Sequence, residues 1–255
     1  MSLARALILR APGTNCDTEA AYAFEQAGAK PEPVNINELI SKRVKLSDYR
    51  ILTFPGGFTY GDDLGAGKVL ANEIRLKLAD DINRFIESGG LILGICNGFQ
   101  VLVKTGILPG PVITIKPGIT LTNNDSGKFE CRWVYLKTAG DSNCVFTKGI
   151  ERMYLPIAHG EGKLIADTEV VSKLNAVLYY TDEEGRKAGY PYNPNGSINN
   201  IAGICDDTGR IFALMPHPER HTRKSQHPRW TRGIAQEPGD GLKVFANAVE
   251  WVRNL

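Results

Sequence analysis

A single cysteine lies where the sequence predicts a sharp turn from a strand into a helix. Cys96 follows the apolar run LILGI, which is typical of a buried strand in a parallel sheet, and it precedes GFQVLVK, which has helical apolar spacing. Gly94 and Gly98 flank it, and small neighbours allow a nucleophile elbow, in which one side chain projects over the sheet. The positive end of a helix dipole also favours a thiolate. The pattern indicates a cysteine nucleophile, with a buried structural cysteine as the alternative.

A second group that can do chemistry lies in FALMPHPER, residues 212–220. Pro216 and Pro218 push the residues before them into extended conformations, so the pattern predicts an extended chain with His217 and Glu219 on one face. A carboxylate beside an imidazole fixes its tautomer and stabilises its cation. An exposed polar turn is the alternative. Combined with the elbow, this stretch predicts a triad of Cys96, His217 and Glu219.

The other cysteines and histidines lack such a context. Four cysteines are interpreted as structural, although the first of them follows the end of a predicted strand: Cys16, Cys131, Cys144 and Cys205. His221 and His227 lie in a basic, polar segment and are predicted to be surface or docking residues. Because no further His or Cys lies at ligand spacing from His159, we expect no metal site.

Strands and helices alternate through the first hundred residues. Strand patterns occupy 4–10, 30–36, 50–57 and 91–95, and helix patterns occupy 16–28 and 68–89. This alternation predicts an α/β fold with a doubly wound, mostly parallel sheet, whose sites lie beyond the carboxyl ends of the strands. The glycine turn at 55–57 and Cys96 both lie at such ends.

The pattern changes after about residue 108. KFECRWVYLK alternates and is rich in aromatic and β-branched residues, and IAGICDDTGRIFALM predicts two strands joined by a hairpin turn at DDTG. We therefore expect an antiparallel extension of the sheet, followed by a closing amphipathic helix over 241–255. Because no linker separates these parts, residues 1–255 are predicted to be one domain.

Bulk composition excludes several classes of protein. The 255 residues are 42% hydrophobic and carry a net charge of +2 without a long run of one sign, so nothing points to nucleic acid or to a membrane surface. The apolar runs are far shorter than the roughly 18 residues of a membrane span, and the first residues lack a signal-peptide pattern. Five cysteines without a C-x-x-C pair argue against a disulfide framework or a zinc site. We expect a cytoplasmic enzyme.

Two of the motifs resemble those of a known enzyme family. GICNGFQ (94–100) and MPHPE (215–219) resemble the class I, or triad, glutamine amidotransferases, which implies a flavodoxin-like core. PGGFTYGDDLGAG, DSGKFECRW, AHGEG and NPNGS are similar to the glutaminase component of phosphoribosylformylglycinamidine synthase, and the similarity runs from the first strand to the end of the chain. One departure is the segment 221–240, which is longer than expected and whose HPRW resembles the tail of the fused form of that enzyme.

The resemblance implies a function with a partner. A separate glutaminase subunit would hydrolyse glutamine to glutamate and ammonia, and an ATP-dependent synthetase would use the ammonia to make formylglycinamidine ribonucleotide in purine synthesis. ATP and Mg²⁺ are expected on the synthetase, with no cofactor in this chain. Whether a small accessory subunit is also required stays open.

The resemblance and the elbow together imply further site residues. Cys96 would attack the glutamine amide, His217 would move the proton, and Glu219 would orient His217. The oxyanion would be bound by the N–H of Asn97 and by an N–H of the glycine turn, at Gly57 or Phe58. By resemblance, Gln100 would contact glutamine, and three pocket residues would face the partner: Arg132, His159 and Glu161. A solvated strand residue is the alternative for Arg132.

Two other functions stay open at this point. Another triad amidotransferase, or a free-standing γ-glutamyl hydrolase, would share the triad but not the FECRW and NPNGS motifs. A redox sensor or chaperone of related fold would use the elbow cysteine, but a sensor needs no oriented general base.

Overall fold

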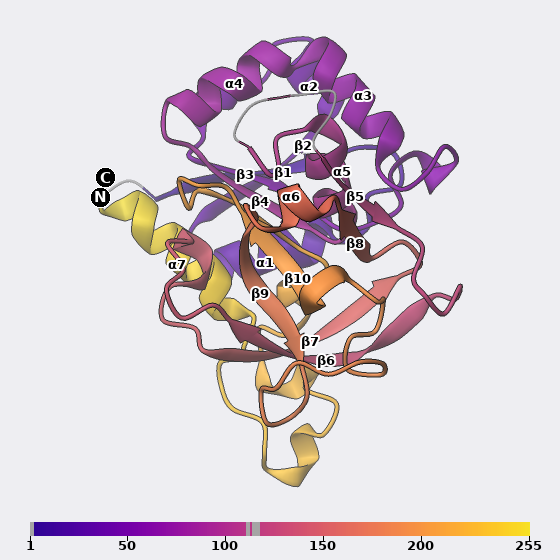
Figure 1. Cartoon of the computed structure of the whole chain (residues 1–255). Coiled ribbons are helices and arrows are strands. Elements are labelled where there is room, and N and C mark those ends of the chain that lie inside the picture. The colour runs from indigo at the N-terminus through magenta and orange to yellow at the C-terminus, as the bar shows by residue number, and fades with distance from the viewer. Residues whose placement is uncertain (1–2, 111–112, 114–117) are drawn as a thin grey trace.

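The structure, a computed structural model, describes residues 3–110, 113 and 118–255 (Figure 1). Nine strands form one mixed sheet in the order β2-β1-β3-β4-β11-β10-β9-β6-β7, and β5 and β8 form a separate pair. The strands are β1 (Arg5–Arg10), β2 (Lys30–Asn35), β3 (Ile51–Phe54), β4 (Leu91–Ile95), β5 (Ile119–Thr122), β6 (Glu130–Thr138), β7 (Arg152–His159), β8 (Lys163–Ala166), β9 (Asn175–Thr181), β10 (Ile201–Cys205) and β11 (Ile211–Leu214).

Seven α-helices connect or follow these strands in the part of the chain that the structure describes: α1 (Asp17–Gln26), α2 (Ile36–Ile40), α3 (Lys68–Lys77), α4 (Ala79–Glu87), α5 (Asn97–Thr105), α6 (Thr168–Val171) and α7 (Leu242–Arg253). Short 3₁₀ turns accompany them: η1 (Leu46–Asp48), η2 (Thr59–Asp62), η3 (Val145–Thr147), η4 (Ile198–Asn200), η5 (Pro218–Arg220), η6 (Lys224–Gln226) and η7 (Trp230–Arg232).

The first half of the chain, together with β11 and α7 from the second half, builds a parallel sheet between two layers of helices. β2, β1, β3, β4 and β11 run parallel to one another. Figure 1 shows α3, α4 and α5 on one side of these strands, and α1 and α7 on the other. β2 carries Pro31 and Pro33 and lies at the edge of the sheet, where missing N–H donors are tolerated. The predicted doubly wound α/β fold is confirmed.

The second half of the chain extends the same sheet in antiparallel fashion. β10 pairs antiparallel with β11 across the DDTG turn, and β9, β6 and β7 continue this pattern. β7 is therefore the far edge strand of the sheet. The predicted antiparallel extension and its hairpin are both present.

The single long helix predicted over 68–89 is wrong. α3 ends at Lys77 and α4 begins at Ala79, because Leu78 has φ −128° and ψ 5° and turns the chain between them. Neither Gly nor Pro lies between Lys68 and Glu87, so no breaker residue marks this turn in the sequence. Asp80 and Asp81 occupy the first turn of α4, where the helix dipole favours acidic side chains.

One cluster of buried apolar side chains runs through both halves of the sheet, from β1 and β3 to β7 and β9. We keep the single-domain interpretation of 1–255, since the strands of both halves pair continuously. No helix of the described residues is long and apolar enough to cross a membrane.

Candidate active site

Cys96 occupies a strained turn between β4 and α5. Its backbone has φ 51° and ψ −105°, a conformation that non-glycine residues rarely adopt. The side chain is 5% exposed, and its Sγ donates to the carbonyl oxygen of Ala158 at 3.7 Å. A Cβ at Gly98 would collide with the carbonyl oxygen of Phe54, and one at Gly94 would lie 3.0 Å from the oxygen of Gly98. The two glycines of the motif are therefore required by close backbone approach.

His217 and Glu219 form a buried pair beyond the end of β11. Nδ1 of His217 lies 2.6 Å from Oε1 of Glu219, and the two residues are 2% and 1% exposed. Burial alone would lower the pKa of His217, but the charge of Glu219 and the nearby Cys96 outweigh it and hold this pKa well above its ordinary value. Nε2 makes no hydrogen bond within the described residues. The free nitrogen is therefore the one available to the thiol.

The backbone around this pair differs in part from the prediction. His217 is extended, with φ −106° and ψ 90°, but Pro218 begins the 3₁₀ turn η5. Proline is favoured at the first position of a helix because it needs no N–H donor there. The predicted extended chain is thus wrong from Pro218 onward, although the predicted contact with Glu219 is present. The N–H of His217 donates to the oxygen of Pro156 at 2.9 Å, so the edge strand β7 holds the loop in place.

Cys16 and Arg220 lie against this pair, a placement that the sequence patterns did not predict. Sγ of Cys16 is 4.0 Å from Nδ1 of His217, and Nη2 of Arg220 donates to this sulfur at 3.0 Å. A Cβ at Gly56 would lie 2.8 Å from Cε1 of His217 and 3.0 Å from the same sulfur. In the sequence, the position of each residue could have indicated this placement, because Cys16 follows the first strand and Arg220 follows the H-P-E motif.

The cluster of Cys16, His217 and Glu219 has the ligand types of a metal site. Its ligand atoms lie within 4.8 Å of one another. However, His217 and Glu219 bind each other, and the guanidinium of Arg220 donates to the sulfur. A cation would have to displace that positive group. We therefore infer that the cluster holds the imidazole of His217 in place and does not bind a metal.

The glycine turn lies beside the elbow and is bound to the β1–α1 connection. The N–H of Phe58 donates to the oxygen of Gly13 at 2.9 Å, and the oxygen of Gly56 accepts from Cys16 at 3.2 Å. The N–H of Gly57 donates no hydrogen bond to any described residue. Of the two donors predicted in this turn, Gly57 is available in this conformation and Phe58 is engaged.

The side chain of Asn97 joins the elbow to the residues after the glycine turn. Its Oδ1 accepts from the hydroxyl of Thr59 at 2.7 Å, and its Nδ2 donates to Asp62 at 3.2 Å and to Gln100 at 2.9 Å. The backbone N–H of Asn97 belongs to the first turn of α5, where helical N–H groups have no intrahelical partner. No described residue accepts a backbone hydrogen bond from this N–H, and its role as the second oxyanion donor stays a prediction.

Gln100 of α5 and Glu161, which follows β7, hold these two parts of the chain together. Nε2 of Gln100 donates to the backbone oxygen of Glu161 at 2.5 Å, and Gln100 is 4% exposed. The carboxylate of Glu161 points toward the start of α3, where it accepts from the N–H of Ala66 at 3.3 Å and lies 4.0 Å from Nζ of Lys104. Both side chains are thus occupied with holding the wall of the site.

His159 is a buried, neutral imidazole at the end of β7. Burial, together with the charge of His217, lowers the pKa of His159 to about 3. Its Nδ1 lies 3.1 Å from Oδ1 of Asn124, whose amide nitrogen is already committed to the oxygens of Lys128 and His159. Nδ1 is therefore the donor, and Nε2, which has no partner among the described residues, is a free acceptor.

Arg132 is farther out on β6. It forms an ion pair with Glu130, donates to the hydroxyl of Tyr190 at 2.8 Å, and stacks over the Tyr190 ring at 4.9 Å. Its side chain is 32% exposed. This position fits the partly solvated strand residue, and the role of Arg132 in facing the partner stays a prediction.

The segment 221–240 packs under β6 and β7, at the lower end of the molecule in Figure 1. His221 is 2% exposed and its Nδ1 lies 2.8 Å from the oxygen of Tyr154. The rings of His221 and His227 lie 5.1 and 5.9 Å from the ring of Trp133. Both histidines are therefore buried and not surface residues as predicted, because the aromatic side chains of the sheet cover them, and a docking role stays a prediction.

Comparisons with known proteins place the chain in a family. A family described as the CobB/CobQ-like glutamine amidotransferase domain matches residues 3–252. Phosphoribosylformylglycinamidine synthase subunit PurQ of Dehalococcoides mccartyi is 64% identical, over the whole of both chains. The PurQ subunit of Methanococcus maripaludis strain S2 is 47% identical, over 97% of each chain.

Solved structures agree with this assignment. The structure of PurLQS from Thermotoga maritima contains a chain that is 35% identical, with a TM-score of 0.77 and coverage of 98% of this chain and 100% of that one. A glutamine amidotransferase from the same organism shares the fold at 16% identity, with a TM-score of 0.58 and coverage of 98% and 97%. The chain therefore belongs to the family of PurQ subunits, the glutamine amidotransferases of phosphoribosylformylglycinamidine synthase.

Proposed function

We propose that this chain hydrolyses glutamine to glutamate and ammonia, and that a separate ATP-dependent synthetase uses the ammonia to convert formylglycinamide ribonucleotide to the amidine. The observation that carries the proposal is the strained elbow of Cys96 beside the buried pair of His217 and Glu219, within a chain 64% identical to a PurQ subunit. The relatives' names supply the partner and the pathway.

The triad supplies the nucleophile and moves the proton. His217, with Glu219 bound at Nδ1, takes the thiol proton of Cys96 at Nε2. The thiolate attacks the side-chain carbonyl carbon of glutamine and forms a tetrahedral oxyanion. His217 then returns the proton to the leaving nitrogen, ammonia departs, and a γ-glutamyl thioester remains. A water molecule, deprotonated by His217, hydrolyses the thioester to glutamate and the free thiol.

We assign stabilisation of the oxyanion to two backbone donors that no described residue engages. The N–H of Asn97 at the start of α5 supplies one donor, and the helix dipole adds to it. The N–H of Gly57 supplies the other, since it has no competing acceptor among the described residues. Phe58 becomes a donor only if the turn separates from Gly13.

The remaining predicted residues take supporting roles. Nε2 of His159 is buried and has no partner among the described residues, which supports a role in accepting a hydrogen bond from a polar group of the substrate. Gln100 and Glu161 hold the elbow helix against the wall of the site, and any direct contact of Gln100 with glutamine requires exchange of its present bonds. Arg132 with Tyr190 offers a half-exposed cationic surface to the partner.

The partner would supply the nucleotide chemistry. ATP and Mg²⁺ belong to the synthetase in this proposal, and this chain needs no cofactor for amide hydrolysis. The structure of PurLQS from Thermotoga maritima supports a synthetase and a small accessory subunit as partners of this chain as well. We place the reaction in the cytoplasm.

A reconstitution experiment tests the proposal. The purified chain is mixed with the synthetase, ATP, Mg²⁺ and formylglycinamide ribonucleotide, and amidine formation is followed with glutamine or with ammonium chloride as nitrogen source. We expect Cys96→Ala to abolish the glutamine-dependent reaction and to leave the ammonia-dependent one intact. Loss of both reactions would show an effect on assembly, and retention of both would exclude Cys96 as the nucleophile.

A further inference from the structure

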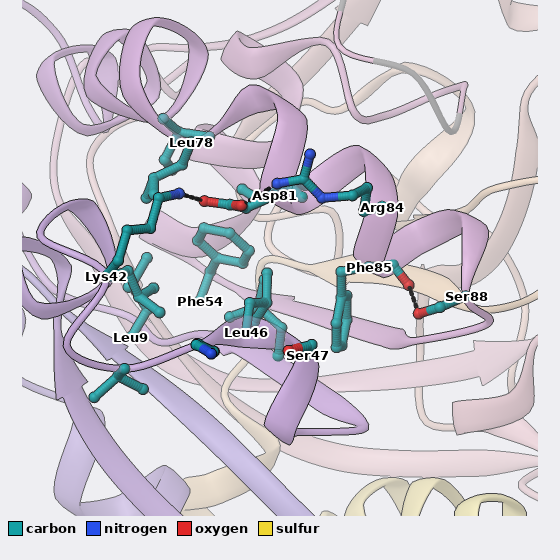
Figure 2. Close-up of a pocket in the computed structure, with 16 residues that line it drawn as sticks. Leu9, Lys42, Leu46, Ser47, Phe54, Leu78, Asp81, Arg84, Phe85 and Ser88 are labelled. Carbon is teal, nitrogen blue, oxygen red and sulfur yellow. Dashed lines mark hydrogen bonds and ion pairs between the residues drawn. The ribbon is translucent and has the colours of Figure 1, made fainter.

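A cavity of about 530 Å³ lies in the parallel half of the molecule, between the sheet and the α3–α4 junction. None of its lining residues belongs to the triad or to the glycine turn. Figure 2 shows the side chains that surround it. Its volume falls in the range of sites that hold small molecules, roughly 300–1,000 Å³.

The walls of the cavity are apolar and come from the sheet, from the helical layer and from the segment 39–47 that follows β2. Leu9 and Phe54 of the sheet form one side, and Leu78 and Phe85 of the helical layer face them (Figure 2). These four side chains are each at most 3% exposed at the outer surface. The break of the helix at Leu78 separates α3 from α4 above the sheet, so this layer is not a single straight rod across the strands.

The mouth of the cavity is ionic and mainly positive. Lys42 and Arg84 both bind the carboxylate of Asp81, as the dashed line to Lys42 in Figure 2 illustrates. Lys45 also lines the cavity, and no ion pair to it is formed by the described residues. Three cationic side chains therefore face one acidic side chain at the rim, and the surplus charge is positive.

A second, polar hollow of about 270 Å³ adjoins this mouth. It shares Lys42, Asp81 and Arg84 with the cavity, and it adds the cations Arg75 and Lys77 and the acidic residue Asp80, so its net charge stays positive. The apolar cavity thus opens beside a basic surface hollow. This arrangement matches a molecule with two chemically different ends.

We propose that this cavity binds a small amphipathic molecule, with its apolar body between the sheet and α3–α4 and its anionic head, a carboxylate or a phosphate, at Lys42, Lys45 and Arg84. Burial of the body drives binding because it removes apolar surface from water. The head gains from the positive rim, where a partly desolvated charge–charge contact orients the ligand.

Binding of 1-anilinonaphthalene-8-sulfonate, which has an apolar body and an anionic head, tests the site. The chain should enhance its fluorescence saturably, at one probe per chain. Lys45→Glu reverses a rim charge without breaking an ion pair and should weaken binding about fivefold. The matched control Lys243→Glu, at an exposed position in the first turn of α7, should leave the dissociation constant unchanged. Equal effects of the two variants would overturn the proposal.

Filling the cavity and changing the head group complete the test. Val44→Trp should remove probe binding, with Ser47→Trp as a second blocking variant if the first melts at a lower temperature than the wild type. Decanoate and decyl phosphate should displace the probe, and whichever displaces it at lower concentration identifies the head group. Displacement by decylamine as strong as by decanoate would overturn the anionic head, and undiminished probe binding in folded blocking variants would overturn the site.

Discussion

The backbone N–H of Phe58 donates a hydrogen bond of 2.9 Å to the carbonyl oxygen of Gly13. This contact binds the glycine turn to the β1–α1 connection and engages the N–H of Phe58, which could join Asn97 and Gly57 at the oxyanion only after the turn separates from Gly13. The turn is also rich in left-handed residues, with φ 55° at Tyr60 and 54° at Asp62. A strained segment that is bound to the β1–α1 connection by backbone hydrogen bonds at Gly56, Phe58 and Tyr60 can be rearranged by a docking partner that replaces these bonds.

The isolated chain should therefore be a poor glutaminase. Adding the synthetase and formylglycinamide ribonucleotide should raise glutamine turnover at least about tenfold, equivalent to roughly 1.4 kcal/mol of barrier. Steady-state assays of glutamate release with and without the partner measure this. Full activity of the chain alone would favour a free-standing hydrolase.

The elbow predicts selective chemical labelling. A glutamine analogue with an electrophilic side chain should modify Cys96 and leave Cys16 unmodified, although both sulfurs lie close to His217. The reason is that the pKa of the Cys16 thiol is raised, chiefly by burial, which disfavours its thiolate. Mass spectrometry of the digested protein locates the label. Modification of Cys16 in preference to Cys96 would contradict the mechanism.

The pair of His217 and Glu219 predicts unequal losses. His217→Ala should reduce kcat by at least about 10²-fold, whereas Glu219→Gln should retain measurable turnover because it removes only orientation and charge. Glu219 raises the pKa of His217, so its neutralisation lowers that pKa. The imidazolium of His217, which gives its proton to the leaving ammonia, is then deprotonated at a lower pH.

The pH profile of kcat in the assembled complex measures this effect. The alkaline limb should move to lower pH in Glu219→Gln, while Glu183→Gln, at an exposed position on the surface, should leave it in place. A shift to higher pH, or none, would show that Glu219 does not hold the imidazolium.

His159 predicts a stability change in mildly acidic solution. The pKa of His159 is about 3 in the folded chain and close to about 6.5 when unfolded, so between these values the unfolded state binds the extra proton. The unfolding free energy should fall by about 2 kcal/mol through this group alone between pH 7 and pH 5. Urea unfolding of the wild type and of His159→Gln at both pH values measures it. Parallel losses in the two proteins would refute the assignment.

Gly98 predicts a steric effect at the elbow. A Cβ at this position would overlap the carbonyl oxygen of Phe54, so Gly98→Ala should destabilise the chain by about 1–3 kcal/mol and misplace Cys96. A Cβ at Gly140 would meet no atom of the described residues within 4 Å, and Gly140 has no positive φ. Gly140→Ala is therefore the matched control and should change stability by less than about 0.5 kcal/mol. Thermal unfolding and glutaminase assays compare them. Equal stability of the two variants would count against the tight elbow.

The sequence predicts those features that depend on local patterns. The alternation of strands and helices, the glycines beside Cys96 and the hairpin at DDTG are all read within a few residues of one another. The contact between His217 and Glu219 is local too. For that reason the predicted contact is present, although the extended conformation predicted for the intervening Pro218 is wrong.

Features that depend on contacts between distant segments could not be predicted from local sequence patterns. Phe58 is engaged by Gly13, which belongs to another connection of the sheet. Cys16 reaches His217 only because β1 and β11 end at the same side of the sheet. His221 is buried because the aromatic residues of β6 and β7 cover it, which its basic neighbours in the sequence do not reveal.

The position of β7 has a consequence for how this enzyme can evolve. Its backbone oxygens at Pro156 and Ala158 accept from His217 and Cys96, although β7 is the outermost strand of the sheet. A slip of one residue in its pairing with β6 would turn His159 to the opposite face. Insertions and deletions in the outer strands are therefore constrained by catalysis, and lineages that acquire new partners should vary the exposed side chains of β6 and β7 while conserving their lengths.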